Sequence, residues 1–503
     1  MSKKIKFCLY IILIVLLFFI CQLTLKGIGA GSSEANAFLF TSLILILSFS
    51  KRTFWFIAFP IFLIQVAYIP IGLVFGLPSY QSIASIRSTN ILETKEFLSQ
   101  ISLYNFSYML LLLVAFILFR FIYVKYKFSM DYNKIIIVLF TLFSFFNQGS
   151  GVFFKESYFS LKKISDIDKD IHSYTNEWGN VSINDHKNRY NTYVLVIGES
   201  ARMDYINAFG YPLNNSPFMS GQGLIVKGLI SGGSNTVASL SNMLTKNDQG
   251  QANFNKNIID LANSAGLTTY WLSNQGFISD ADTPISLIAT KSQYKDFIKY
   301  GAFNSQNSSD FELVDRFKQI VDKNTDQPKL IIVHLYGSHP KPCARVNDYP
   351  EQFRANKKEQ KQIACYVNSI KKTDDVLKEI NSILDDDFKR NHASYSMVYF
   401  ADHGLVHNDS KKEIQLVHGE SINSYRVPLF TISSDDIDHR QCDSMKSGLH
   451  FIDGLATWLA IKNDYLDPTY DLFDCKNDPA AQSYLDSLRP KFKSDNTAIN
   501  IAL

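Results

Sequence analysis

The sequence predicts a membrane-anchored α/β protein with a five-helix transmembrane domain over residues 1–154, a linker over 155–190 and a domain over 191–503 built on a mostly parallel sheet flanked by helices. Long uncharged runs are confined to the first part, and short apolar strands alternate with amphipathic segments in the last. Residues 1–150 contain 12 Lys and Arg against 4 Asp and Glu, whereas the rest of the chain contains 38 against 43. This split excludes a single soluble domain and a strongly basic nucleic-acid-binding protein, although the total net charge is only +3.

Five uncharged runs predict the transmembrane helices. A helix needs about 20 apolar residues to cross the hydrocarbon core of a bilayer, and four runs come close to that length while the second is shorter. The first run is too long for a signal peptide and lacks a small-residue cleavage site. The runs are Phe7–Leu25, Ala35–Ser50, Thr53–Leu77, Leu103–Phe119 and Ile135–Phe154.

Basic residues predict the orientation of these helices. Cations precede the first run, separate the second from the third and follow the fourth, which is the alternation expected when they all face the cytoplasm. Five spans then place everything after about residue 155 on the far side of the membrane, which is the periplasm in a Gram-negative organism. The three clusters are Lys3, Lys4 and Lys6; Lys51 and Arg52; and Arg120, Lys125 and Lys127.

Four cysteines fall in the exported part: Cys343, Cys365, Cys442 and Cys475. An even number of cysteines in an oxidising compartment indicates two disulfides. The simplest pairing is 343–365 with 442–475, but spacing alone leaves three pairings open.

Four apolar runs predict the strands of the exported domain, and the segments between them predict helices. The strands are Tyr193–Ile197, Thr268–Leu272, Leu330–Leu335 and Tyr395–Phe400. The helices include Phe254–Ala265, Phe311–Val321 and Ile363–Leu384. In a parallel sheet of this kind, functional side chains gather at the carboxyl ends of the strands.

Polar clusters follow three of these strands. They are Gly198-Glu199-Ser200, Gly337-Ser338-His339 and Asp402-His403-Gly404, and His418-Gly419-Glu420 follows later. Carboxylate and imidazole ligands together suit Zn²⁺, and suit Mn²⁺ less well. Each cluster alone is more typical of a turn or a helix cap than of a catalytic site, so the prediction rests on their shared position at strand ends.

A glycine-hydroxyl loop, Ser231–Leu240, lies between the first two strands and precedes a helix. Its backbone amides could hold a phosphate, and a serine or threonine there could act as a metal-activated nucleophile. The alternative is that Ser234 or Asn235 only caps the helix.

These motifs resemble those of the lipid A and lipopolysaccharide phosphoethanolamine transferases, membrane members of the alkaline phosphatase/sulfatase superfamily. The resemblance is carried by Val196–Arg202, the Asn-Asn-Ser-Pro run ending at Pro217, the glycine-hydroxyl loop, Gly-Ser-His339 and Ala-Asp-His-Gly404, in that order after five spans. It extends from the first span to about residue 460 and implies an alkaline phosphatase/sulfatase-like domain.

The resemblance also implies roles for individual residues. Glu199, Asp402, His403 and the nucleophile would bind zinc. The family nucleophile is normally threonine, and counting back from Met243 selects Ser234, with Thr236 as its rival. One zinc ion is expected, and a second is left open.

Further residues match positions that the family uses for substrates. His339 and His418 match histidines that contact the substrate phosphate or a second zinc. Asn90 and Thr94 resemble a motif near the lipid-binding cleft, and Tyr270–Gly276 resembles the branch that modifies core sugars.

The implied reaction moves phosphoethanolamine from phosphatidylethanolamine to a core sugar or lipid A of lipopolysaccharide, through a covalent enzyme intermediate. It would take place at the bacterial inner membrane, with the catalytic domain in the periplasm. Two alternatives remain: a phosphoglycerol transferase acting on an envelope glycan, and an inactive envelope assembly protein.

Overall fold

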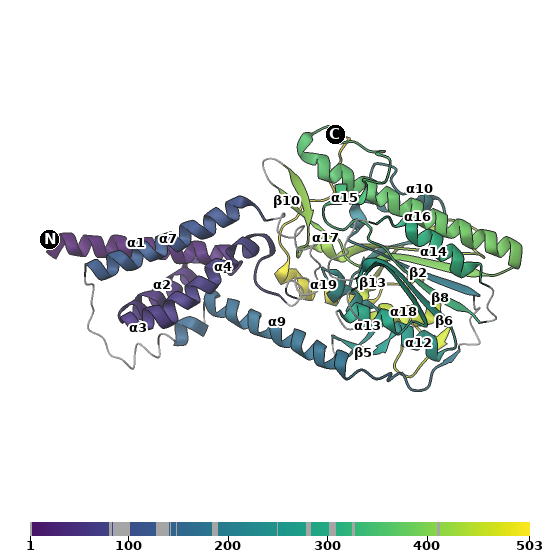
Figure 1. Ribbon diagram of the computed structural model, residues 1–503, viewed down its shortest axis with the longest axis horizontal. Coiled ribbons are helices and arrows are strands. Elements are labelled where there is room, and N and C mark those ends of the chain that lie inside the picture. The colour runs from purple at the N-terminus through teal and green to yellow at the C-terminus, as the bar shows by residue number, and fades with distance from the viewer. Residues whose placement is uncertain are drawn as a thin grey trace. The chain divides into compact units, whose positions relative to one another are not determined.

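The computed structural model describes residues 3–79, 83, 101–126, 140, 142–146, 148–183, 190–248, 250–277, 283–300, 308–323, 327–409 and 413–502. Of these, the residues up to 165 form one compact unit and those from 166 onward form another. Figure 1 shows the helical first unit and the sheet of the second.

Three helices of the first unit are long and apolar enough to cross a membrane, within the described ranges: Lys4–Gly27, Lys51–Phe75 and Leu103–Lys125. A shorter apolar helix covers the second predicted span. Residues 135–139, 141 and 147 of the fifth predicted span lie outside the described part of the chain. The helices are α1 (Lys3–Gly27), α2 (Glu34–Ser48), α3 (Lys51–Thr53), the π-helical η1 (Phe54–Ala58), α4 (Phe59–Phe75), α7 (Leu103–Lys125) and the amphipathic α9 (Gly149–His172).

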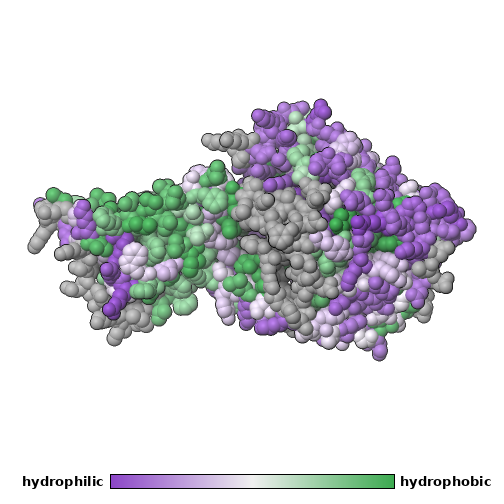
Figure 2. All heavy atoms as spheres, viewed as in Figure 1, coloured by the Kyte–Doolittle hydropathy of each residue, from purple (hydrophilic) through white to green (hydrophobic). Residues whose placement is uncertain are grey.

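Aromatic packing joins these helices to one another. Phe62 of α4 stacks on Phe116 of α7 with ring centroids 3.8 Å apart, and both side chains are fully buried. Other large apolar side chains, among them Phe56 and Leu111, point outward. Figure 2 accordingly shows a largely hydrophobic surface over this unit and a largely hydrophilic one over the second. Such a surface is stable in lipid but would be unfavourable in water.

The second unit is built around an eight-stranded sheet with the order β13-β3-β12-β9-β2-β8-β6-β7. The five strands from β9 to β7 run parallel, and β12 is antiparallel to both of its neighbours. This is the mostly parallel sheet that the sequence predicts. The strands are β2 (Thr192–Gly198), β3 (Leu224–Ile230), β6 (Thr268–Phe277), β7 (Tyr294–Tyr300), β8 (Lys329–His334), β9 (Tyr395–Ala401), β12 (Arg426–Ser433) and β13 (Arg440–Ser447).

Helices cover both faces of this sheet (Figure 1), with α14 and α16 on one face and α12, α13 and α18 on the other. The central strands β2 and β9 are buried along their whole length, which explains their continuous apolar runs. The helices are α10 (Pro217–Gly221), α11 (Thr236–Met243), α12 (Ile258–Ser264), α13 (Pro284–Thr290), α14 (Phe311–Val321), α15 (Pro342–Arg345), α16 (Lys361–Asn391), α17 (Ile422–Tyr425), α18 (Phe451–Trp458) and α19 (Pro479–Leu488). Smaller two-stranded sheets pair β1 (Ser182–Ile183) with β14 (Ile461–Lys462), β4 (Thr245–Asp248) with β5 (Gln251–Asn257), and β10 (Val406–Asp409) with β11 (Ile414–Val417).

One predicted helix, Phe254–Ala265, is wrong in its first third. Residues 254–257 belong to β5, and α12 begins only at Ile258. The side chain of Asn257 accepts hydrogen bonds from the backbone N–H groups of Ile259 and Asp260, so it caps the helix at that point.

Both disulfides form as the simplest pairing predicts. Cys343 is bonded to Cys365 and Cys442 to Cys475, with Cα atoms 4.8 and 5.1 Å apart. The first bond ties α15 to α16, close to the turn that carries His339.

Candidate metal centre

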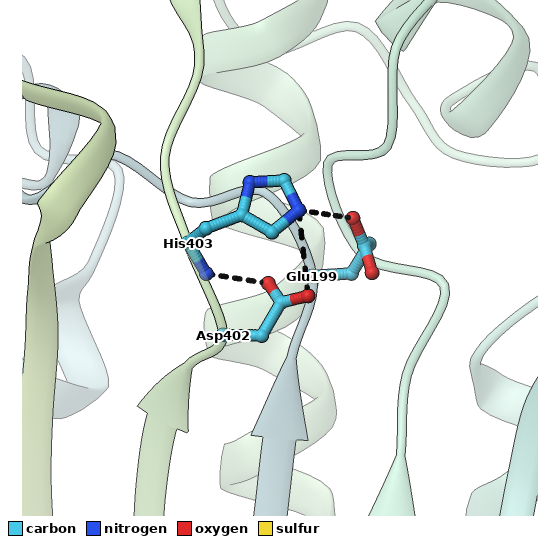
Figure 3. A group of neighbouring side chains, drawn as sticks. All are labelled: Glu199, Asp402 and His403. Atoms are coloured by element: carbon cyan, nitrogen blue, oxygen red, sulfur yellow. Dashed lines mark hydrogen bonds and ion pairs between the residues drawn. The ribbon is translucent and has the colours of Figure 1, made fainter. Parts of the chain in front are cut away.

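Two adjacent parallel strands deliver the central side chains. Gly198 at the end of β2 lies opposite Ala401 at the end of β9. The next residues in each chain segment are therefore neighbours, and Glu199, Asp402 and His403 are almost completely buried, with at most 1% exposed. Figure 3 shows the three side chains converging on one point.

Their atoms are close enough to share one ion. The Nε2 atom of His403 lies 3.5 Å from a carboxylate oxygen of Glu199 and 3.5 Å from one of Asp402. One ligand atom from each of the three residues falls within 4.8 Å of the others. Two carboxylate oxygens and one imidazole nitrogen form a ligand set that suits a divalent cation.

The electrostatics of this group favour a cation. Burial and the nearby Glu199 charge raise the pKa of Asp402 to about 7. Burial alone would lower the pKa of His403, but the two carboxylates outweigh it and raise that pKa to about 9. For Glu199, the hydrogen bond and charge of His403 overcome the effect of burial and lower the pKa. Oδ2 of Asp402 is buried and receives no hydrogen bond from the described residues, so an oxygen remains that a metal ion would satisfy.

The glycine-hydroxyl loop places a threonine against this group. Asn235 caps α11 by accepting a hydrogen bond from the N–H of Ala238, and Thr236 is the first helical residue. The Thr236 hydroxyl donates to Oε2 of Glu199 at 3.0 Å and lies 3.4 Å from Nε2 of His403.

Ser234, the residue that the sequence favours as nucleophile, has a different contact. Its hydroxyl donates to Oε1 of Glu420 at 3.0 Å. The loop packs tightly on α11, since a Cβ atom at Gly233 would lie 2.7 Å from the backbone nitrogen of Ser239. The hydroxyl bonded to Glu199 is therefore that of Thr236, the first residue of α11, and not that of Ser234.

Two further predicted histidines lie beside the group. The ring of His418 lies 5.1 Å from that of His403 and 6.0 Å from that of His339, measured between centroids. Burial, followed by the charges of the other two histidines, lowers the pKa of His418 to about 3, so this ring is neutral at physiological pH. The predicted lipid-site residues Asn90 and Thr94 lie outside the described residues.

Sequence reasoning missed two residues that hold the site together. The Asp310 carboxylate accepts hydrogen bonds from the backbone N–H groups of Tyr336 and Gly337, at 2.8 and 2.9 Å, and so fixes the turn before His339. Gln275 donates from Nε2 to Oε2 of Glu199 at 3.3 Å. An aspartate just before a helix normally indicates a cap, so only its spatial position reveals the contact of Asp310.

A buried arginine network lies next to Glu199. The side chain of Arg202 is fully buried and bonds Asp204 at 2.7 Å and Asp495 at 3.0 Å. Its Nη2 also donates to the backbone oxygen of Asn496. His407 contacts the same Asp495 carboxylate through Nδ1 at 2.9 Å. Asp495 and Asn496, near the end of the chain, thus hold the segment at Arg202, three residues after Glu199.

Comparison with known proteins places this geometry in a family. Residues 191–461 match the Sulfatase family model. A putative phosphoethanolamine transferase of Haemophilus influenzae is 41% identical over 422 residues, covering 81% of this chain and 85% of that protein. Phosphoethanolamine transferase OpgE of Escherichia coli is 31% identical, covering 80% and 79%. In fold, the chain resembles the integral membrane protein lipooligosaccharide phosphoethanolamine transferase A from Neisseria meningitidis, with a TM-score of 0.61 at 15% identity, over 86% of this chain and 89% of that one.

Proposed function

The chain belongs to the phosphoethanolamine transferases of the sulfatase family, and from this premise we propose that it transfers phosphoethanolamine from phosphatidylethanolamine to lipopolysaccharide, at a core sugar or at lipid A. The proposal rests on Thr236, the first residue of α11, whose hydroxyl donates a hydrogen bond to the buried Glu199 carboxylate. A hydroxyl in that position is arranged to become a nucleophile.

Thr236 attacks the phosphorus of the donor lipid. A bond forms between its oxygen and phosphorus while the bond to the diacylglycerol oxygen breaks. An acceptor hydroxyl or phosphate then attacks the same phosphorus and releases the threonine. His339 and His418 flank the site: His339 is the group that would carry a proton between the entering and leaving oxygens, and the neutral His418 ring would donate a hydrogen bond to a phosphate oxygen.

Glu199, Asp402, His403 and the Thr236 hydroxyl are the groups that would hold a zinc ion. When bound, zinc lowers the pKa of a hydroxyl and offsets negative charge on phosphate oxygens. The buried pair of carboxylates with a single imidazole supports this assignment.

Glu420 favours ethanolamine over glycerol as the donor headgroup. Its carboxylate accepts hydrogen bonds from Ser234 and from Tyr425, at 3.0 and 2.8 Å, and it follows His418 by two residues. A carboxylate in this place can pair with the ammonium of phosphoethanolamine, whereas glycerol offers no charge. Lys493 lies near the same carboxylate. Burial lowers the pKa of this lysine, and the Glu420 charge partly opposes that effect.

A membrane location suits both lipid substrates. The three long apolar helices would hold the protein in the bacterial inner membrane, and the basic residues at one end of these helices support a periplasmic catalytic domain. The solved relative is, by its name, a lipooligosaccharide-modifying enzyme, which supports an acceptor of that chemical class.

The nucleophile can be tested by mass spectrometry of the purified full-length protein incubated with phosphatidylethanolamine. We expect wild type and Ser234→Ala to carry a phosphoethanolamine adduct and Thr236→Ala to carry none. An adduct on Thr236→Ala but not on Ser234→Ala would restore Ser234 as nucleophile. A phosphoglycerol adduct formed from phosphatidylglycerol would instead support the alternative donor.

The acceptor can be tested by comparing envelope glycans from cells with and without the gene. Phosphoethanolamine lost from lipopolysaccharide is the expected result. A loss confined to another glycan would overturn the acceptor assignment while leaving the transferase chemistry intact. Absence of zinc and of any adduct would instead support an inactive assembly protein.

A further inference from the structure

An apolar groove opens between the start of the second long helix, Lys51–Phe75, and the end of α7. It has a volume of about 430 Å³, which lies within the range of roughly 300–1,000 Å³ typical of ligand pockets. Four aromatic side chains and two cations line most of it: Phe54, Trp55, Phe59, Phe121, Lys51 and Arg120. None of its lining residues is acidic, within the part of the chain that the structure describes.

Arg120 is an unusual residue for this place. It belongs to a helix that is otherwise apolar enough to span a membrane, and only 7% of it is exposed. One guanidinium nitrogen donates to the backbone oxygen of Ser48 at 2.8 Å, and the group lies 4.2 Å above the Phe54 ring. The Nε atom is buried and has no hydrogen-bond partner among the described residues. A buried donor without a partner is costly, so a ligand that accepts from it would stabilise the groove.

The groove lies at the basic end of the helices. α1 begins at Lys3, α2 ends at Ser48, the next long helix begins at Lys51 and α7 ends at Lys125, so these termini share one end of the unit. Cations gather at this end, which assigns it to the cytoplasmic side. Anionic lipids are abundant on that side, and basic pockets between membrane helices bind their headgroups.

We propose that this groove binds an anionic phospholipid of the cytoplasmic leaflet. The lipid phosphate accepts hydrogen bonds from Arg120 and pairs with Lys51, while an acyl chain lies against Phe54 and Phe121. Two cations without an acidic partner in the lining favour a net negative lipid over a zwitterionic one. The site is separate from the donor chemistry proposed above, which takes place in the second unit and uses a zwitterionic lipid.

Thermal unfolding and native mass spectrometry of the delipidated full-length protein test this proposal. Phosphatidylglycerol should raise the melting temperature and remain bound in the mass spectrum, whereas phosphatidylcholine and inorganic phosphate should do neither. Arg120→Gln and Lys51→Gln should each weaken phosphatidylglycerol binding about fivefold, the effect of losing roughly 1 kcal/mol per cation. Arg52→Gln is the matched control, since Arg52 is an exposed cation next to Lys51 that does not line the groove.

Several outcomes would overturn the proposal. Equal binding of phosphatidylcholine would show that charge plays no part, and an equal effect of inorganic phosphate would reduce the site to a simple anion site. Wild-type affinity in Lys51→Gln would also count against the proposal. Because Lys51 is exposed, this variant should fold and remains decisive even if Arg120→Gln does not fold. Failure here would leave phosphoethanolamine transfer unaffected, because Thr236 and the metal centre lie in the other unit.

Discussion

Replacing Asp310 with asparagine should weaken both the stability of the second unit and its chemistry. The two carboxylate oxygens accept from the N–H groups of Tyr336 and Gly337, and Oδ1 also accepts from Asn274 at 2.8 Å. An asparagine has only one acceptor oxygen, so at least one of these buried donors would face an NH₂ group. Hydrogen bonds to charged groups contribute roughly 1.5–3 kcal/mol each, and we expect a loss of about 3 kcal/mol.

The same substitution should slow the reaction. Gly337 has a positive φ of 46°, and a Cβ atom there would lie 3.0 Å from the backbone of Glu199, so this turn packs directly on the metal-site residue. Loosening it would displace His339, and a displacement of about 1 Å can cost on the order of 100-fold in rate. We expect kcat to fall by about that factor, with a smaller change in KM.

Both effects can be measured on the full-length protein in detergent. A loss of about 3 kcal/mol in a unit of this size corresponds to a melting temperature lowered by roughly 5 °C. Glu312→Gln removes an equal charge two residues away, at an exposed position, and should stay within about 0.5 kcal/mol of wild type. Wild-type stability and kcat in Asp310→Asn would refute the reasoning, and a loss of stability with unchanged kcat would restrict Asp310 to a structural role.

Three further predictions concern the second unit. A chelator should lower the melting temperature of wild type and added zinc should restore it, while Asp402→Ala should respond to neither, because ligand binding stabilises only the protein that retains the site. Replacing Cys343 and Cys365 with serine should lower the unfolding free energy by about 3 kcal/mol in urea unfolding, as expected for a closed loop of this length, and a reductant, which also opens Cys442–Cys475, should lower that of wild type further. Burial would raise the pKa of Asp495, but the His407 hydrogen bond and the Arg202 charge outweigh it and lower that pKa from 3.8 to about 2. The ionised carboxylate therefore stabilises the folded protein above about pH 4, and this contribution is lost as the pH falls toward 2. Asp495→Asn should therefore cost roughly 2 kcal/mol at pH 7 and almost nothing at pH 2 in urea unfolding, and an equal cost at both values would contradict this.

The sequence was sufficient to predict the central strands and the convergence of the three candidate metal ligands at their ends. β2 and β9 are buried on both sides, so they appear as continuous apolar runs, and the polar residues directly after them lie at the same edge of a parallel sheet. This rule places Glu199, Asp402 and His403 together, and their assignment as zinc ligands, which comes from the family resemblance, stays a prediction.

The strand-end rule could not predict which hydroxyl, that of Ser234 or that of Thr236, lies against Glu199. Ser234 and Thr236 are two residues apart in a glycine-rich loop, where no periodic pattern determines which side chain points inward. The start of α11 determines it, and that start depends on Asn235 acting as the cap. Asp310 and Gln275 reach the site from strand ends and loops far away in the sequence, so only the folded structure brings them together.

The bonds around Arg202 set an order of events during biosynthesis. Arg202 is buried against Asp495 and Asn496, which follow every residue of the metal centre in the chain. A growing polypeptide therefore contains all the metal-site residues before it contains the segment that closes over the neighbouring arginine. The finished network can form only after synthesis has passed residue 496, so a nascent chain that stalls earlier would hold the Arg202 guanidinium through Asp204 without its contacts to Asp495 and Asn496.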